Sequence, residues 1–139
     1  MDTRRDDGGF TLVELLVVIV IIGVLSAIAI PAMAVQSKKA KFAALKAALK
    51  SAVLAQEARA TEDLPYATPG DDGIAQLITE GYVVSSSVDL IVVDDDMTAA
   101  GRGFCLRAHH VTLPDSEDMY FASSGTDAGS PTFTACTAS

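Results

Sequence analysis

The sequence predicts an α+β chain in which one long N-terminal helix packs on a small antiparallel sheet of three or four strands. Two observations lead to this prediction. Residues 32–62 contain no glycine and no proline, and they are rich in Ala, Lys and Leu, which favour helices. After residue 64, short β-branched and aromatic runs alternate with Gly, Asp and Ser turn signals. The part of the chain after residue 64 is long enough for one small domain.

The apolar block from Leu15 to Val35 contains 21 residues and no charged side chain. As a helix it extends about 30 Å, which spans the hydrocarbon core of a bilayer. Gly23 and Pro31 are the expected helix-break positions, because Pro31 removes a helical hydrogen bond and Gly23 adds backbone freedom. We expect the helix to kink or loosen between them, and a mild kink in a continuous helix is the alternative for the isolated chain.

Glu14 lies just inside the start of this apolar region. A carboxylate that enters hydrocarbon costs at least about 2 kcal/mol, so a partner and a function are expected for it. The stretch around it reads Gly9-Phe10-Thr11-Leu12-Val13-Glu14-Leu15. It resembles the signature of the type IV pilin family and its pseudopilin relatives, in which a short polar leader ends in Gly and Phe then opens a long apolar helix. The likeness is close over the N-terminal part of the chain and holds only in outline after it.

The resemblance implies cleavage after Gly9 by a prepilin peptidase and N-methylation of the new N-terminus at Phe10. It implies that Glu14 acts in assembly by meeting the N-terminal amine of a neighbouring subunit, and an ammonium partner makes a buried carboxylate tolerable. The implied product is a homo-oligomeric helical filament, with an assembly ATPase and a platform protein as indirect partners. The chain would first be a single-pass prepilin in the cytoplasmic membrane and then part of an extracellular pilus. Adhesion, motility, DNA uptake and secretion all use this architecture.

This interpretation divides the chain into four segments. They are a leader (residues 1–9), a transmembrane and assembly helix (10–34), an amphipathic continuation (35–64) and a globular head (65–139). Asp6 and Asp7 depart from the positive charge that the family's leader usually keeps near its Gly. Residues 62–139 carry 13 acidic side chains against two Arg, so the head has no basic surface for nucleic acid.

Other interpretations of the N-terminal region stay open. An ordinary secretory signal peptide would end at the Ala-x-Ala site of residues 32–34, before Val35. A simple single-span anchor is a second possibility, and both leave Glu14 without a role. For the whole chain, a pseudopilin of a type II secretion or competence system is the nearest alternative. A membrane-anchored or secreted binding domain is the alternative from a different class.

The second half of the predicted helix has two apolar faces, which suggests two surfaces to cover. We expect its bulky face to pack on the chain's own head. The opposite, Ala-rich face would allow close approach of neighbouring helices, or it is solvated. The lysines between the faces form a solvated stripe or pair with acidic heads of neighbours, in preference to lipid phosphates or nucleic acid. The helix should end at Leu64, before Pro65. The bulky face comprises Val35, Phe42, Leu45, Leu49, Ala52, Val53 and Ala60.

The head should contain one short helix followed by the sheet. The helix is predicted over Gly73–Thr79, with Asp71 or Asp72 as its N-cap and Gly81 closing it. Period-two alternation and β-branched content predict strands at Val88–Val93, Gly103–Val111 and Asp118–Ala122, and a short edge strand at Thr132–Ala135.

Cys105 and Cys136 both lie in the last third of the chain. In a domain outside the cytoplasm such a pair predicts one disulfide, which would stabilise the fold by about 3–4 kcal/mol in the chain-entropy model. Two free thiols are the alternative.

No cofactor or metal is expected. Two acidic clusters, residues 94–96 and 115–118, hold enough oxygens for Ca²⁺ if they converge, but contiguous Asp residues in a turn are more often solvated. His109 and His110 are a poor metal pair, because neighbouring strand residues point to opposite faces. The sequence shows no nucleophile–base arrangement, P-loop or Cys-x-x-Cys motif, so an enzyme is not predicted.

Overall fold

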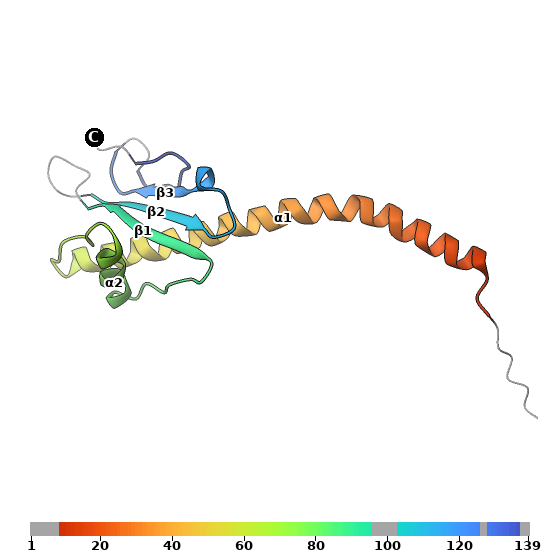
Figure 1. Ribbon diagram of the computed structural model, residues 1–139. Coiled ribbons are helices and arrows are strands. Elements are labelled where there is room, and N and C mark those ends of the chain that lie inside the picture. The colour runs from red at the N-terminus through yellow and green to blue at the C-terminus, as the bar shows by residue number, and fades with distance from the viewer. Residues whose placement is uncertain (1–8, 96–102, 126–127, 137–139) are drawn as a thin grey trace, which may run out of the picture. The chain divides into compact units, whose positions relative to one another are not determined.

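The computed structural model describes residues 9–95, 103–125 and 128–136. In chain order these form α1 (Leu12–Thr61), α2 (Asp71–Thr79), β1 (Val88–Asp94), β2 (Cys105–His110), the short 3₁₀ helix η1 (Asp115–Glu117) and β3 (Met119–Ala122) (Figure 1). The chain divides into two compact units, Met1–Lys39 and Ala40–Ser139. The first contains the N-terminal part of α1, and the second contains the rest of α1 and the head.

Helix α1 runs without interruption through both Gly23 and Pro31. The helix therefore does not break at Gly23 or Pro31 in the isolated chain, which agrees with the alternative of a continuous helix. Pro31 removes the donor of a single backbone hydrogen bond. The turns on both sides keep their own hydrogen bonds, and these suffice to continue the helix.

The end of α1 lies earlier than the predicted Leu64. The helix ends at Thr61, and Asp63 takes a left-handed conformation with φ of 57°. The N–H groups of Asp63 and Leu64 then donate to the carbonyl oxygens of Ala60 and Arg59, at 3.3 and 3.0 Å. This is a Schellman ending, and it terminates the helix before Pro65 is reached.

The sheet is antiparallel with the strand order β1-β2-β3. The long helix packed on a small antiparallel sheet is the predicted α+β architecture. The predicted fourth strand at Thr132–Ala135 does not form. Only Thr132 pairs with Tyr120 of β3, through two backbone hydrogen bonds of 2.8 and 2.9 Å. Pro131 supplies no N–H to extend the pairing.

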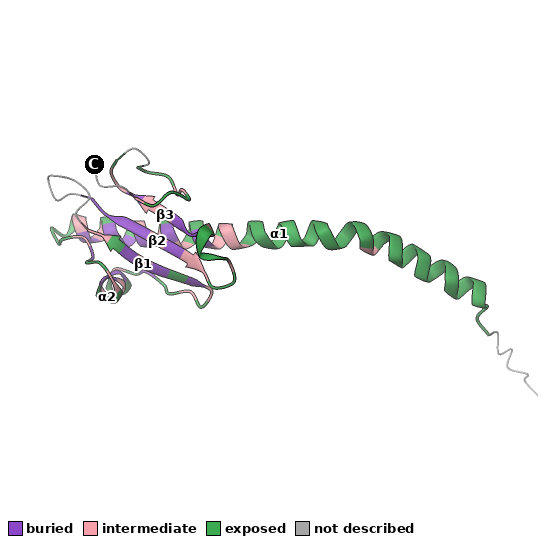
Figure 2. Ribbon diagram, turned by 45° about the horizontal axis from the view of Figure 1, so that its top comes forward, coloured by how far each residue is buried: buried purple, intermediate pink, exposed green. Residues whose placement is uncertain are grey.

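The core lies between the sheet and residues 40–61 of α1 (Figure 2). Strand β1 alternates strictly, so that Val88, Leu90 and Val92 point inward. The predicted bulky face of α1 is only partly correct. Leu45, Leu49 and Ala52 are fully buried, whereas Val35 lies exposed in the other unit. The buried stripe continues instead through Ala55, Gln56 and Arg59.

The polar residues at the end of this stripe hold the loop that follows α1. The amide oxygen of Gln56 accepts a hydrogen bond from the Ala67 N–H at 2.8 Å. The guanidinium of Arg59 donates to the carbonyl of Pro65 at 3.0 Å and lies 3.7 Å from the carboxylate of Glu80. These contacts give Oε1 of Gln56 and the guanidinium of Arg59 polar partners in the head, whereas Nε2 of Gln56 has no hydrogen-bond partner among the described residues.

Helix α2 begins two residues before the predicted start, and its N-cap is Gly70 in place of Asp71 or Asp72. Gly70 has a φ of 87°, which other residues rarely adopt, and its N–H donates to Val92 of β1 at 3.0 Å. This bond fixes the start of α2 against the sheet. Gly81, at φ 93°, closes the helix as predicted.

Candidate processing and assembly site

The Gly9–Phe10 bond lies just ahead of α1, on an exposed segment. The Phe10 side chain is 89% exposed. A Cβ added at Gly9 would meet no atom within 4 Å, and its φ is not in the left-handed region. The described part of the chain therefore does not require glycine at position 9. A requirement for glycine here would come from another protein that recognises this segment.

Thr11 and Glu14 form a reciprocal cap at the first turn of α1. The backbone N–H and the hydroxyl of Thr11 both donate to Oε2 of Glu14, at 2.9 and 2.8 Å. In return, the N–H of Glu14 donates to the Thr11 hydroxyl at 3.2 Å. This is a capping box, which satisfies N–H groups that the first turn of a helix otherwise leaves without partners.

The capping box leaves one carboxylate oxygen of Glu14 available. Both hydrogen bonds from Thr11 go to Oε2, and Oε1 accepts no hydrogen bond from the described residues. The anion also lies at the N-terminus of α1, where the helix dipole favours negative charge. The carboxylate is thus held in position by its own chain while half of its acceptor capacity remains for a second donor.

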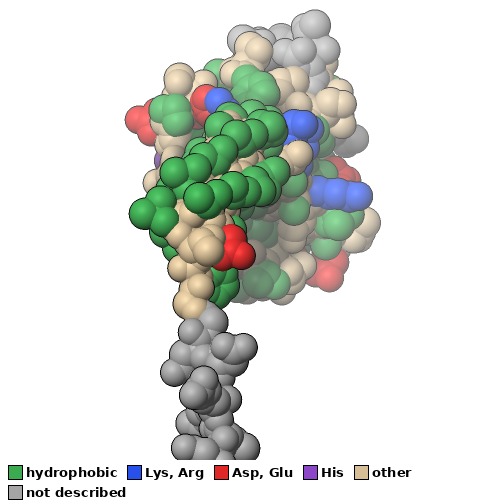
Figure 3. Space-filling view, turned by 90° about the vertical axis from the view of Figure 1, so that its right-hand side faces the viewer, with side chains coloured by type: hydrophobic (Ala, Val, Ile, Leu, Met, Phe, Trp, Pro, Cys, Tyr) green, Lys and Arg blue, Asp and Glu red, His purple; other side chains and the backbone are tan. Residues whose placement is uncertain are grey.

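The surface around Glu14 is apolar. From Leu15 to Val35 every residue is exposed except the half-buried Ser26. Figure 3 shows hydrophobic side chains over the visible side of this helix. By length and composition α1 can cross a membrane, and its most apolar window lies near the N-terminus with none of it buried. Such a surface requires lipid or other protein to cover it.

The structure brings some of the predicted site residues together and places others elsewhere in α1. Gly9, Phe10 and Glu14 lie together at the start of α1, and Gly23 and Pro31 lie within the helix without breaking it. Thr11 was missed as a functional residue. The signal was present in the sequence, since Thr11-Leu12-Val13-Glu14 has the Thr-x-x-Glu spacing of a capping box directly before an apolar run.

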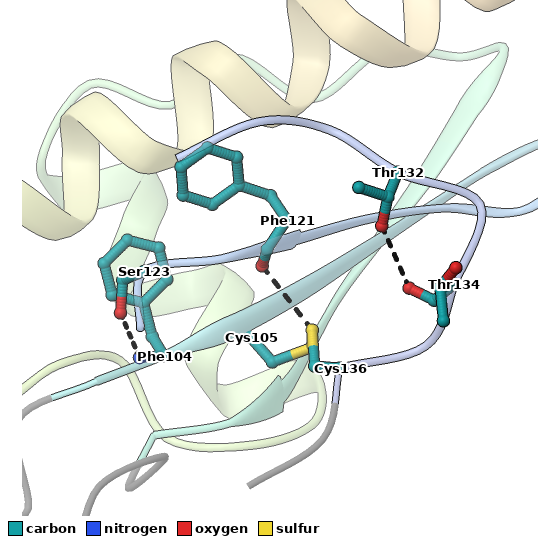
Figure 4. Close-up of a disulfide and its surroundings, with 7 residues drawn as sticks. All are labelled: Phe104, Cys105, Phe121, Ser123, Thr132, Thr134 and Cys136. Carbon is teal, nitrogen blue, oxygen red and sulfur yellow. Dashed lines mark hydrogen bonds between the residues drawn. A yellow bond between two sulfur atoms is a disulfide. The ribbon is translucent and has the colours of Figure 1, made fainter. Parts of the chain in front are cut away.

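Cys105 and Cys136 are joined by a disulfide in the head (Figure 4). Cys105 is fully buried at the start of β2, and Cys136 follows the segment that lies beside β3. The disulfide and the Tyr120–Thr132 hydrogen bonds together hold this segment along the free edge of β3. A covered edge cannot pair with a strand of another molecule.

The acidic side chains do not assemble into a metal site within the described part of the chain. No group of three or more His, Cys, Asp or Glu there is placed to hold an ion. Oδ1 of Asp118 is instead hydrogen-bonded to Nδ1 of His109 at 2.7 Å, and Oδ2 of Asp118 lies 3.8 Å from Nε of Arg107. His110 contacts the Thr112 hydroxyl. Asp96, part of the predicted cluster at 94–96, lies outside the described residues.

Comparison with known proteins agrees with this arrangement. Residues 4–30, which contain the Gly9–Phe10 bond and the capping box, match the family model described as the prokaryotic N-terminal methylation motif. The chain is 33% identical to the type IV wide pilus major component PilA4 of Thermus thermophilus over 106 residues. This matched stretch covers 76% of each of the two chains. The chain belongs to the type IV pilin family.

The match to PilA4 extends well beyond the N-terminal motif, so the family assignment includes the head of this pilin. The long apolar helix and the three-stranded antiparallel sheet are the α+β fold of type IV pilins. The family consists of structural subunits. No solved structure matches the chain.

Proposed function

We propose that this pilin is the structural subunit of a type IV pilus-like filament, and that Glu14 pairs with the N-terminal amine of a neighbouring subunit. The observation that carries the proposal is that the two oxygens of the Glu14 carboxylate differ in their hydrogen bonds. Oε2 caps the chain's own helix, and Oε1 is available to accept from an ammonium group. PilA4, the relative with a named role, is a major component of a pilus.

The N-terminal amine exists only after processing. We infer cleavage after Gly9 by a prepilin peptidase, followed by N-methylation at Phe10. The exposed segment offers access to the bond, and the absence of any structural need for glycine at position 9 fits recognition by a second protein. Cleavage places the new amine four residues before Glu14. A neighbour displaced by about one helical turn, ~5.4 Å, brings its amine level with this carboxylate.

The apolar surface of α1 has two successive environments in this proposal. Residues 10–34 lie in the cytoplasmic membrane in the prepilin, with the leader in the cytoplasm and residues 65–139 outside. An assembly ATPase and a platform protein then move subunits into the filament, where the apolar helices cover one another. An unpaired carboxylate in such surroundings costs several kcal/mol, so an ammonium partner favours the assembled state.

The helix between Gly23 and Pro31 is the segment that could loosen during this transfer. It is continuous in the isolated chain, yet it lacks the hydrogen-bond donor of Pro31 and carries the flexibility of Gly23. Loosening on assembly would extend the apolar helix without disturbing the head.

Substitution of Glu14 tests the proposal. In Glu14→Gln the side chain can still accept hydrogen bonds from Thr11, but it carries no charge to pair with an ammonium group. We expect membrane insertion and cleavage to persist and filaments to be lost. Glu57→Gln, at an exposed position of the same helix, is the matched control and should assemble normally. Normal filaments from Glu14→Gln would show that assembly does not need the charge of Glu14, and this would contradict the pairing.

A further inference from the structure

A groove in the head lies between α2 and β1, which are neighbours in the fold (Figure 1). Its volume is about 320 Å³. Ile74, Ile78, Val84 and Leu90 contribute apolar side chains to its lining, and the exposed carboxylates of Asp71 and Asp89 also line it. The groove therefore combines an apolar surface with negative charge.

Several apolar side chains in and beside this groove are exposed. Ile78 is 47% exposed and Val84 is 58% exposed. Val83, between Val84 and the end of α2, is more exposed still. A contiguous apolar patch bordered by charges is typical of a surface that another protein covers. The two carboxylates favour a partner that presents an apolar side chain next to a cation.

The exposed face of α1 within the second unit presents that combination. Between residues 40 and 61, Leu54 is the single large apolar side chain that is exposed, at 63%. Lys50 lies one helical turn before it, with about 5–6 Å between their Cβ atoms. Lys50 is exposed and forms no ion pair with a described residue. Leu54 and Lys50 thus have the chemistry that the groove fits.

We propose that Leu54 of one copy of this chain docks in the α2–β1 groove of a second copy. The Lys50 ammonium then lies beside the carboxylates of Asp71 and Asp89. A buried leucine supplies the apolar contact, and the charge pairs fix its orientation. The inference rests on the proposed function only because the filament supplies the second copy.

The geometry of the two surfaces suits an open assembly. The groove and the Leu54 surface are different regions of the same chain, so each copy can offer its α1 to one neighbour and its groove to another. Such a heterologous contact repeats along a filament when its rotation does not close a ring. The contact would therefore link heads in addition to the association of the apolar helices.

Paired substitutions in the full chain test the contact. Leu54→Ser should lower filament yield about tenfold, since the loss of one buried leucine corresponds to at least that factor in affinity. Val111→Ser is the matched control, because Val111 is similarly exposed and does not line the groove. Equal yields from the two variants would overturn the proposal. Thermal unfolding of both chains in detergent checks that the head remains folded.

A charge exchange tests the orientation. Lys50→Asp and Asp71→Lys should each reduce assembly, and the double variant should restore it, because every copy then carries both reversed charges. Glu62→Lys makes the same charge change as Asp71→Lys at an exposed position outside the groove and should assemble normally. A double variant that assembles no better than the two single variants contradicts the pairing.

A photo-crosslinker placed at position 54 in assembled filaments identifies the occupant directly. We expect crosslinks to the peptide that contains Ile78 and Val84 of another copy. Crosslinks to a different segment, or to another protein, overturn the proposal. If the unsubstituted chain is processed but forms no filaments, the proposed function fails and the docking proposal fails with it. Filaments that tolerate both Leu54→Ser and Lys50→Asp defeat the docking proposal alone.

Discussion

The Thr11 hydroxyl donates to Oε2 of Glu14 at 2.8 Å and accepts from the Glu14 N–H at 3.2 Å. This reciprocal pair fixes the carboxylate at the first turn of α1 before any neighbour is present. A carboxylate whose rotamer is already fixed loses less conformational freedom when it binds a partner. The pair therefore links the folding of the helix terminus to the proposed assembly chemistry.

Replacing Thr11 should weaken filament assembly while leaving Glu14 itself intact. Thr11→Val keeps the side-chain shape but removes the hydroxyl, which costs about 1 kcal/mol of capping. Thr11→Ser restores a hydroxyl that can make the same bonds. We expect filament yield to fall in Thr11→Val and to recover in Thr11→Ser, as measured by electron microscopy and by quantifying sheared filaments. Equal yields from the two variants would show that the cap has no part in assembly.

Gly73 has no space for a side chain, so substitution at this position should destabilise the head. A Cβ at this position would collide with the carbonyl oxygen of Thr68, which belongs to the backbone and cannot turn aside. Gly73→Ala should lower the free energy of unfolding by about 1–3 kcal/mol. Gly23→Ala is the control, because a Cβ there meets no atom within 4 Å. Thermal unfolding of the full chain in detergent measures both, and an unchanged head transition in Gly73→Ala would contradict the expectation.

Removal of the disulfide should release the segment that covers β3. In a Cys105→Ser, Cys136→Ser chain we expect a loss of about 2–4 kcal/mol in unfolding free energy. We also expect faster hydrogen exchange at the amides of Tyr120 and Thr132, which bond each other across this edge. The amide of Leu90 in the core provides the internal reference. Unchanged exchange at Tyr120 would mean that the hydrogen bonds alone hold the segment.

Tyr82 should make the stability of the head depend on pH in alkaline solution. Burial raises the pKa of its phenol above the ordinary value of 10.0, because the charged form is poorly solvated. The folded state then binds the proton more tightly than the unfolded state. The contribution of Tyr82 to stability is therefore fully present below pH 10.0 and is lost as the pH rises from there through the higher folded pKa.

Tyr82→Phe removes this titration. The hydroxyl has no hydrogen-bond partner among the described residues, so the substitution should cost little stability at neutral pH. Chemical unfolding at pH 7 and at increasing alkaline pH compares the two chains. An identical alkaline loss of stability in both chains would assign the effect to other groups.

Some of this structure follows from the sequence by periodicity and local signals alone. The three strands β1 to β3, the α2 helix and its closure at Gly81 lie where alternation and glycine placement predict them. The Thr11–Glu14 cap was also available from spacing. The positions of these features are marked by local signals, which are apolar alternation, glycine placement and the Thr-x-x-Glu spacing, and these signals can be recognised without knowing which segments pair.

Other features depend on contacts that the sequence pattern does not reveal. The burial of Gln56 and Arg59 requires partners in the loop after α1, at Ala67 and Pro65. The early end of α1 depends on Asp63 in a left-handed conformation, a position for which glycine is the usual signal. Gly70 replaces an aspartate as the cap of α2 because its N–H is bonded to Val92 in the sheet. In each case tertiary contacts decide between local alternatives.

The mass and N-terminal sequence of the mature protein, purified from its native host, test the central claim most directly. The proposed processing predicts a chain that begins at N-methylated Phe10, with the first nine residues absent. A chain that begins at Val35 would instead show secretion of a soluble domain and would leave Glu14 outside the mature protein. A chain that keeps Met1 would contradict prepilin processing and leave a membrane anchor.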